Sequence, residues 1–512
     1  MGPDAARPAP TYRLVRALLL RGVGVVFVIA FVSLWVQVDG LFGSLGIAPI
    51  TELLEGAQDR LGAEALHRVP SLFWLGSSDA WLHVMCAAGT VLGALVALGV
   101  APGLLVPALW ALYLSFASAG SPFLDFQWDA LLLETAFFSA LYAWPRSTPS
   151  RVGLWLLRWL LFRLVFTSGL VKLLSGDETW SQLTALSYHY WTQPLPAWTS
   201  VFAAGLPAWI QSFSTAATLA IELLAPLGIF GPRPVRLAAC ALLVLLQCVI
   251  AATGSYGFFN LLTLVLCVSL LDDDALRALV PRRFRRPTES AREPAPRDDP
   301  PPPVRREAIL RAAGIAGAAL LVAITVVASS GRIAPGLRLP AAVVRTMSWL
   351  GPFRTFNAYG LFAVMTTERP EIGVEGSQDG RAWREYVFRW KPGPLDRRPE
   401  LAGPYMPRLD WQMWFAALGR CEHEAWLHAF LVRLLEGDPD VVALLASDPF
   451  SGAAPRLIRT TLWRYRFAPL KDRHLGVWWT RERVGPYCPT VTLDNGRLRA
   501  VEDFPAEGDP RE

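Results

Sequence analysis

The sequence predicts a mostly α-helical, polytopic membrane protein with a smaller α+β domain towards its C-terminus. Of its 512 residues, 53% are hydrophobic and only 18% are charged, and 21 are tryptophan and 26 phenylalanine. An ordinary soluble protein of this length is less apolar and more highly charged. Several windows of about 18 or more residues lack polar interruptions, which is enough for a helix to cross a bilayer. We therefore expect a transmembrane helical bundle of about nine spans, followed by a non-cytoplasmic domain with antiparallel strands.

The expected spans form a membrane domain over residues 1–274 and a final transmembrane helix over 308–330. The first span follows Arg13 and Arg16 and lacks a small-residue cleavage site, so we interpret it as a retained anchor. Basic residues mark alternate loops, which places the N-terminus inside and, after an odd number of spans, the C-terminus outside. The expected spans are 17–37, 80–99, 103–119, 125–143, 153–174, 207–230, 236–253, 256–271 and 308–329.

Residues 275–307 are expected to form a cytoplasmic linker rich in proline and arginine. Such a charged, proline-rich composition is typical of an extended tether and not of a packed element. The final span carries small residues four positions apart, Ala313 with Gly317 and Gly314 with Ala318. These permit close packing against the bundle or against a second copy in a homo-oligomer.

Residues 340–505 are expected to form the independent α+β domain, which has an ordinary size for such a unit. Ile372 and Val374 alternate with polar residues before Asp379-Gly380, a dipeptide typical of hairpin turns. The alternation resumes after this turn at Tyr386, Phe388 and Trp390. Helical periodicity follows in LDWQMWFAALG (409–419) and HEAWLHAFLVRLLEG (423–437), and further strands are expected at TLWRYRF (461–467) and GVWWTRE (476–482).

Two of the expected spans carry ionisable side chains of opposite sign. A charged group at bilayer depth is costly, so it usually faces a partner or a water-filled cavity. Asp125 and Asp129 share one helix face, and Arg158 and Lys172 share another, so we expect a carboxylate face to meet a cationic face. These charges either lock the register of the bundle or form a polar pocket in which Lys172 acts as a base. The charges are Asp125, Asp129 and Glu134 in the span 125–143, and Arg158, Arg163 and Lys172 in the span 153–174.

Several functional classes are excluded by composition and motifs. The net charge of +5 reflects arginines beside hydrophobic segments, so we expect membrane lipids and no nucleic acid as partners. The sequence contains no G-x-S-x-G elbow, P-loop or dinucleotide fingerprint, and we expect no cofactor. His423 and His428 in HEAWLH are one residue too far apart for a helical zinc pair, so we expect no metal site there.

Two cysteines lie in the polar C-terminal region and leave an alternative open. Cys421 and Cys488 form a disulfide if that region faces an oxidising compartment. They stay free otherwise, since the sequence alone does not bring their Cα atoms within bonding distance.

Long runs of this sequence, spread in order over nearly the whole chain, resemble the lipase maturation factor family. The N-terminal tail and the proline-rich linker do not take part in the resemblance. The runs are FQWDALLLE (126–134), LLRWLLFRLVFTSGLVKLLSGDETW (156–180), LTALSYHYWTQPLP (183–196), YGFFNLLTLVLCVSLLDD (256–273), FNAYGLFAVMTTERPEI (356–372), RLDWQMWFAALG (408–419) and LWRYRFA (462–468).

The resemblance implies a multi-span membrane protein that assists the folding or assembly of secreted lipases or other exported clients, without a catalytic step of its own. Vertebrate members of the family reside in the endoplasmic reticulum. The composition of this chain suggests a bacterial source, for which the C-terminal domain would be periplasmic and the client could differ. The resemblance places client binding in the C-terminal domain, and the candidate residues are Asn357, Tyr359, Asp410, Trp411, Gln412 and Trp414.

The membrane half is also distantly similar to the transmembrane domain shared with vitamin K-dependent carboxylase. That similarity rests on the lysine-bearing span and on Gly176, Asp177 and Trp180 after it. It supplies the alternative of a membrane enzyme that acts on a lipid-soluble substrate. An envelope adaptor protein is a third possibility. An enzyme would require an enclosed polar cavity around Asp129, Glu134, Arg163 and Lys172.

Overall fold

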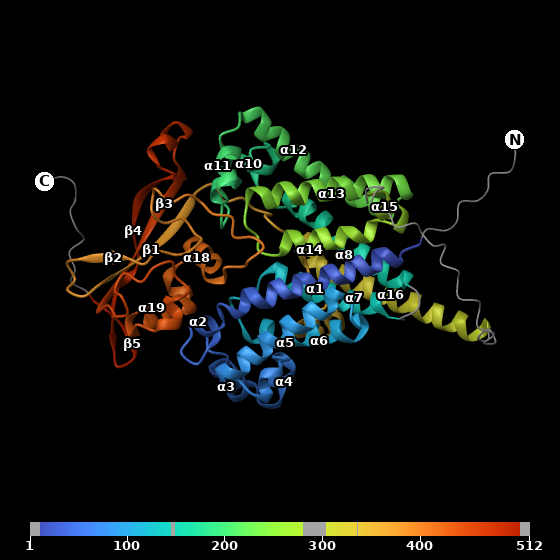
Figure 1. Cartoon of the computed structure of the whole chain (residues 1–512), viewed down its shortest axis with the longest axis horizontal. Helices are drawn as coiled ribbons and strands as arrows, with labels where there is room; N and C mark the ends of the chain where they lie inside the picture. Colours follow the sequence, from blue (N-terminus) through green and yellow to red (C-terminus); the bar gives the residue numbers. More distant parts are fainter. Residues whose placement is uncertain (1–10, 145–148, 280–303, 335, 502–512) are drawn as a thin grey trace.

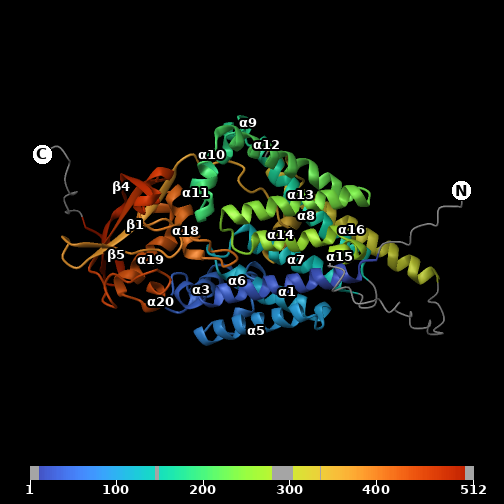
Figure 2. The same ribbon diagram turned by 45° about the horizontal axis from the view of Figure 1, so that its top comes forward.

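The computed structural model describes residues 11–144, 149–279, 304–334 and 336–501. The protein is elongated, with a bundle of long helices at one end and a β-sheet domain at the other (Figure 1). The sheet domain caps one end of the bundle, and α1 (Arg13–Trp35) begins at the opposite end. A second view shows the same arrangement (Figure 2). The mostly helical fold with a small C-terminal sheet confirms the predicted fold class.

Within the described residues, seven helical segments are long and apolar enough to cross a membrane. Their exposed faces are rich in leucine, valine and phenylalanine, as expected of surfaces in contact with lipid tails. These segments are α1, α5 (Asp79–Leu98), α6 (Pro102–Ala119), α8 (Arg151–Leu174), α12 (Ala208–Leu224) continued by the 3₁₀ turn η3 (Ala225–Phe230), α13 (Arg233–Thr253) and Ala312–Ile333 of α16 (Val304–Ile333).

Two of the nine predicted spans correspond to shorter helices. The helix α7 (Gln127–Ala143) has 17 residues, because the chain before it forms a turn containing Pro122. The helix α14 (Phe259–Cys267) continues into the short 3₁₀ turn η4 (Val268–Leu270). Both lie inside the bundle, where their side chains are mostly buried by neighbouring helices. Seven described segments, and not nine, therefore meet the length expected of a span.

Close backbone contact between α1 and α5 sets one side of the bundle. A Cβ added to Gly24 of α1 would lie only 2.4 Å from the backbone nitrogen of Ala97 in α5. Small residues at helix crossings allow membrane helices to approach closely and gain van der Waals contact. Phe27 and Phe31 on the same side of α1 are fully buried and contact the ring of Tyr113 in α6. The core of the bundle is therefore closely packed around α1.

Short helices cover the ends of the bundle, and part of the predicted linker is helical. Residues 275–279 belong to α15 (Asp273–Leu279) and residues 304–307 to α16, whereas 280–303 lie outside the described residues. The other short helices are α2 (Val38–Phe42), α3 (Ile50–Leu61), α4 (Ala65–Arg68), α9 (Glu178–Ser181), α10 (Ala185–Thr192), α11 (Trp198–Ala204) and α17 (Ala341–Leu350), with 3₁₀ turns η1 (Gly62–Glu64), η2 (Leu72–Leu75) and η6 (Gly351–Phe353).

The C-terminal domain is built on one antiparallel sheet with the strand order β2-β1-β3-β4-β5. Ile372 of β1 lies opposite Leu462 of β3, and the alternating residues Ile372 and Val374 are fully buried. The strands are β1 (Arg369–Ser377), β2 (Trp383–Glu385), β3 (Leu457–Phe467), β4 (Trp479–Asp494) and β5 (Arg497–Ala500), and the helical elements are α18 (Arg408–Leu418), η7 (Cys421–His423), α19 (Ala425–Glu436), α20 (Pro439–Val442) and η8 (Leu470–Leu475).

The second strand of the predicted hairpin is shorter than the sequence pattern suggests. Strand β2 ends at Glu385, although the backbone N–H of Tyr386 still donates to Val374 across the turn. Further along, the backbone N–H groups of Trp390 and Lys391 both donate to the carboxylate of Asp410, at 2.8 Å each. Because these donors bind a side chain of α18, they are not available for pairing with β1.

Candidate functional site at the junction of bundle and C-terminal domain

A fully buried ion pair joins the bundle to the C-terminal domain. Asp129, in the first turn of α7, accepts from Arg408, the first residue of α18, through both guanidinium nitrogens, at 2.9 and 3.1 Å. The hydroxyl of Tyr113 also donates to Asp129, at 2.5 Å. Both charged side chains are 0% exposed. A bidentate pair of this kind satisfies the carboxylate and fixes the orientation of α18 relative to α7.

A second buried carboxylate of α7 binds the segment that leads into the sheet. Glu134 forms an ion pair with Arg163 of α8, and both side chains are almost fully buried. Glu134 also accepts from the Tyr359 hydroxyl at 2.6 Å and from the side-chain amide of Asn357 at 3.2 Å. Arg163 donates to the backbone oxygen of Asn357 at 2.9 Å. This network holds the segment around residues 357–359 against the two helices.

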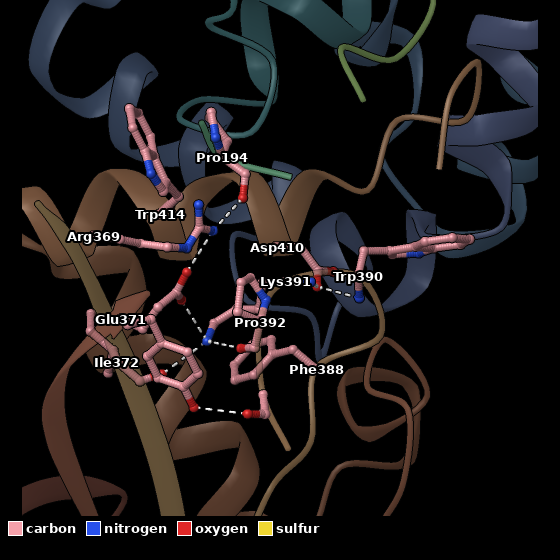
Figure 3. A network of polar contacts seen from close by, with 12 residues as sticks. Pro194, Arg369, Glu371, Ile372, Phe388, Trp390, Lys391, Pro392, Asp410 and Trp414 are labelled. Atoms are coloured by element: carbon pink, nitrogen blue, oxygen red, sulfur yellow. Dashed lines mark hydrogen bonds and ion pairs between the residues drawn. The ribbon is translucent and has the colours of Figure 1, made fainter. Parts of the chain in front are cut away.

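A third buried cluster lies where β1 approaches the loop before α11 (Figure 3). Glu371 forms ion pairs with Arg369 at 2.7 Å and with Lys391 at 2.9 Å, and the three side chains are at most 4% exposed. Arg369 also donates to the backbone oxygens of Trp191, Gln193 and Pro194, which belong to the membrane half. Because burial disfavours its charged form, the pKa of Arg369 is lowered from its ordinary value.

The helix α18 is the element that brings these contacts together. Burial raises the pKa of Asp410 despite the backbone N–H bonds from Trp390 and Lys391. The indole of Trp414 donates to the backbone oxygen of Thr192 at 3.0 Å. Burial opposes the charge on Arg408, but the charge and hydrogen bonds of Asp129, together with those of Tyr113, outweigh this effect, so that the pKa of Arg408 is raised. The helix is therefore bound on both sides, by its own domain and by the bundle.

The predicted meeting of a carboxylate face with a cationic face is wrong. Only Glu134 and Arg163 pair across α7 and α8, whereas Asp125 pairs with Arg354 at 2.6 Å and Asp129 with Arg408. Both of these arginines come from the chain beyond the last span. Helix periodicity did not predict these pairs, because the two arginines lie 229 and 279 residues further along the chain than their aspartates.

The two remaining cations of the predicted span 153–174 also have other partners. Arg158 donates to the backbone oxygen of Ser269 at 2.9 Å. Lys172 donates to both carboxylate oxygens of Glu222 in α12, at 2.8 and 2.6 Å. Lys172 thus lies in a different part of the bundle from Asp129, and the four residues Asp129, Glu134, Arg163 and Lys172 do not share one enclosed cavity.

The six predicted client-binding residues all lie at this junction. Asn357 is half-buried, and the other five side chains belong to residues at most 8% exposed. Direct contact with a client would therefore require the junction to open. Their role in client binding stays a prediction. In the structure they lie between the bundle and the sheet. The buried five are Tyr359, Asp410, Trp411, Gln412 and Trp414.

Sequence reasoning missed several charged residues of these networks, among them Arg369, Arg408 and Glu222. Arg369 and Arg408 stood inside the runs FNAYGLFAVMTTERPEI and RLDWQMWFAALG, but nothing in their local pattern indicates burial. Glu222 was detectable, because it is an acidic residue within an otherwise apolar span, where a charge normally has a partner.

The structure joins Cys421 and Cys488 by a disulfide, which connects η7 to β4. The Nε2 atom of His428 lies 3.4 Å from the Sγ of Cys421, so these three residues are close enough together to hold a metal ion if the cysteines were reduced. Metal binding by cysteine requires thiolates. With both sulfurs in the disulfide, the cluster offers one imidazole and no thiolate.

Comparisons with known proteins cover nearly the whole chain. The lipase maturation factor transmembrane domain matches residues 14–278, and the lipase maturation factor C-terminal domain matches residues 355–489. Lipase maturation factor 2 of Gallus gallus is 35% identical, covering 97% of this chain and 83% of the relative. The Homo sapiens lipase maturation factor 2 is 35% identical over 96% of this chain and 84% of the relative. Lipase maturation factor 1 of Bos taurus is 35% identical over 97% of this chain and 92% of the relative.

No solved structure matches the chain. The matched relatives are named as maturation factors and lend no support to the enzyme alternative. The bacterial source and the similarity to vitamin K-dependent carboxylase stay predictions. Together, the apolar helices and the matched transmembrane domain make this a multi-pass integral membrane protein. Since both matched domains and relatives more than 30% identical extend over most of its length, the chain belongs to the lipase maturation factor family.

Proposed function

We propose that this protein is a membrane-bound maturation factor that assists the folding or assembly of exported lipases or other exported clients. The observation that carries the proposal is the continuous relationship to named lipase maturation factors over almost the whole chain, including both domains. The protein acts in this proposal as a scaffold and not as an enzyme, and it needs no cofactor.

The C-terminal domain is the proposed client-facing part. Buried charge networks hold it firmly on the bundle, so a client that binds the domain is kept at the membrane surface. Exposed apolar side chains on a domain of this kind often mark a protein interaction site. Such side chains in this domain belong to Val364, Leu395, Leu401, Phe415, Leu418, Leu470, Leu475 and Val484.

The proposed orientation places this domain on the non-cytoplasmic side. Arg13 and Arg16 belong to the start of α1, which begins at the end of the bundle away from the sheet (Figure 1). Arg233 pairs with Asp272, and the neighbouring Asp273 accepts from the backbone N–H of Arg13, so Arg233 lies at the same end. Positively charged residues favour the cytoplasmic side of a membrane. The domain would be periplasmic in a bacterium and lumenal in the endoplasmic reticulum of a eukaryote.

The proposal is tested by crosslinking in native membranes combined with a deletion strain of the source organism. We expect an exported lipase among the proteins crosslinked to the full-length chain and reduced secreted lipase activity in the deletion strain. Complementation should restore that activity, both with the original gene and with the exposed-site control Arg420→Gln. Unchanged secreted activity in the deletion strain, with no lipase among the crosslinked proteins, would contradict a lipase client.

A further inference from the structure

A cavity lies between α8, α12, α13 and α14, and its wall also includes Leu361 and Phe362 of the segment that leads into the sheet. It consists of two adjoining pockets, each with about 570 Å³ of empty space, open solvent included. The pockets adjoin because they have six lining residues in common. These are Lys172, Glu222, Leu246, Ile250, Tyr256 and Phe362.

The position of the cavity gives it access to lipid. The spanning segments that contain α12 and α13 lie at the periphery of the bundle, each with only 33% of its most apolar window buried. Leu242 and Leu245 of α13 are 43% and 57% exposed, as lipid-facing residues are, whereas Val249, which is 49% exposed, also lines the cavity. On the inner side of the same helix, Leu246 and Ile250 line the cavity. A hydrocarbon chain that enters beside α13 would therefore contact these two apolar side chains.

The polar groups of the cavity carry no net charge. Lys172 and Glu222 form an ion pair in which the ammonium group donates to both oxygens of the same carboxylate, at 2.8 and 2.6 Å. The third proton of the ammonium group is left for another acceptor. A charged ligand would lack a counter-charge here, and an unpaired buried charge is costly. The cavity is thus suited to an uncharged ligand.

Two side-chain amides provide an unpaired donor and an unpaired acceptor beside this ion pair. The Nδ2 of Asn260 donates to the Oε1 of Gln247 at 2.9 Å, and the two residues are 5% and 6% exposed. Among the residues that the structure describes, the Nε2 of Gln247 and the Oδ1 of Asn260 have no hydrogen-bond partner. Both residues line the cavity. Buried polar groups normally have partners, so a ligand is the natural source of them.

We propose that this cavity binds an uncharged acylglycerol with a free hydroxyl group, such as a diacylglycerol. Its hydroxyl would donate to the Oδ1 of Asn260 and accept from the Nε2 of Gln247, and an ester carbonyl would accept the third proton of Lys172. One acyl chain fills the apolar part of the cavity, and the rest of the lipid extends along α13 into the bilayer. This proposal concerns binding only and does not depend on the client-maturation function.

The test uses the full-length protein in phosphatidylcholine nanodiscs and a photoactivatable, clickable diacylglycerol. We expect labelled peptides from α8, α12, α13 or α14 at the lining positions, and competition by unlabelled diacylglycerol. Neither an anionic fatty acid nor a quinone, which offers acceptors only, should compete as well. Labelling confined to other helices, or equal competition by either of these lipids, would overturn the proposal.

Matched variants separate the cavity from the lipid-facing surface. Leu246→Trp fills the cavity, so labelling should fall by at least about tenfold, whereas the neighbouring lipid-facing variant Leu245→Trp should label like the original protein. Gln247→Leu removes one hydrogen-bonding group and should weaken binding about fivefold. Thr263→Val serves as its control, since Thr263 is a buried polar residue of α14 that does not line the cavity. Equal labelling of Leu246→Trp and Leu245→Trp, with unchanged thermal unfolding midpoints, would overturn the proposal.

Discussion

Asp125 and Asp129 lie four residues apart, but their surroundings differ. Asp125 precedes α7 and pairs with Arg354 near the surface, where the two side chains are 43% and 22% exposed. Asp129 and Arg408 are both fully buried. Exposed ion pairs contribute little to stability, whereas removal of one partner from a buried pair leaves an uncompensated charge.

The variant Asp129→Asn should therefore lower the free energy of unfolding by about 3 kcal/mol. Asp125→Asn, its matched control, should lower it by less than about 1 kcal/mol, because solvent screens the pair. Denaturant titration of the purified protein in detergent, followed by tryptophan fluorescence, measures both. Similar losses in the two variants would contradict the assignment of the buried pair as the stronger contact.

His189 of α10 is a partly buried histidine that should stay neutral near pH 7. Its Nε2 lies 2.9 Å from the hydroxyl of Tyr256, and its ring contacts the edge of Phe362. Burial, and secondarily the charge of Lys172, lowers the pKa of His189 from 6.5 to about 4. Between these two pH values the unfolded chain binds a proton that the folded protein does not.

The folded state should consequently lose stability as the pH falls from about 6.5 towards 4, by on the order of 1–3 kcal/mol for this residue. His189→Gln removes the titrating group and keeps a polar side chain of similar reach. We expect a smaller decrease of the unfolding midpoint over this pH range in the variant than in the original protein. Parallel pH profiles for the two proteins would show that His189 is already charged, or not buried, in the folded state.

At the scale of elements, a disulfide connects the helical part of the C-terminal domain to its sheet. Among the described residues it is the one covalent crosslink between side chains. It joins η7 to β4 across 67 residues. A crosslink of this kind stabilises the folded state mainly by restricting the unfolded chain.

Replacing both cysteines, Cys421→Ser with Cys488→Ser, should destabilise the C-terminal domain by about 2–4 kcal/mol. Cys248→Ser is the control, because Cys248 is a free and exposed cysteine of α13. Limited proteolysis should cleave the double variant in the region 420–490 much sooner than the control. Equal protease resistance of the double variant and the original protein would contradict a stabilising disulfide.

Sequence patterns predicted the main elements of this domain but not their ends or their partners. Alternation located β1 and β3, and helical periodicity located α18 and α19. The sequence pattern did not predict that β2 ends at Glu385. This end depends on hydrogen bonds from the backbone N–H groups of Trp390 and Lys391 to Asp410, which lies 19–20 residues further along the chain. In the membrane half, apolar length predicted α7 and α14 as full spans, since hydropathy does not distinguish lipid-facing helices from helices buried by protein.

At the scale of the molecule, the sequence was sufficient for the fold class and the family, and insufficient for the docking of the C-terminal domain. The hydropathy pattern and the runs that resemble the lipase maturation factor family each extend over many residues. They therefore predicted the fold class and the family correctly. The docking depends on single long-range contacts, such as Asp129 with Arg408, which are 279 residues apart. No local pattern encodes such a partner, so the junction became visible only in the structure.

The proposed orientation is testable with single cysteines at the two ends of the molecule. In a variant with Cys248 replaced, Val100→Cys lies in the loop between α5 and α6, and Ser447→Cys lies in an exposed loop of the C-terminal domain. In sealed vesicles with the cytoplasmic face outward, an impermeant maleimide should label Val100→Cys directly. It should reach Ser447→Cys only after permeabilisation. The reverse pattern would invert the proposed topology.

The central claim is that the C-terminal domain serves client maturation while held on the bundle by buried charges. Its most direct test is the activity of the secreted client lipase in a deletion strain complemented with Asp129→Asn or with Asp125→Asn, normalised to the amount of membrane protein. We predict that Asp125→Asn restores the activity and that Asp129→Asn restores much less of it. Full restoration by Asp129→Asn at equal abundance would contradict the claim.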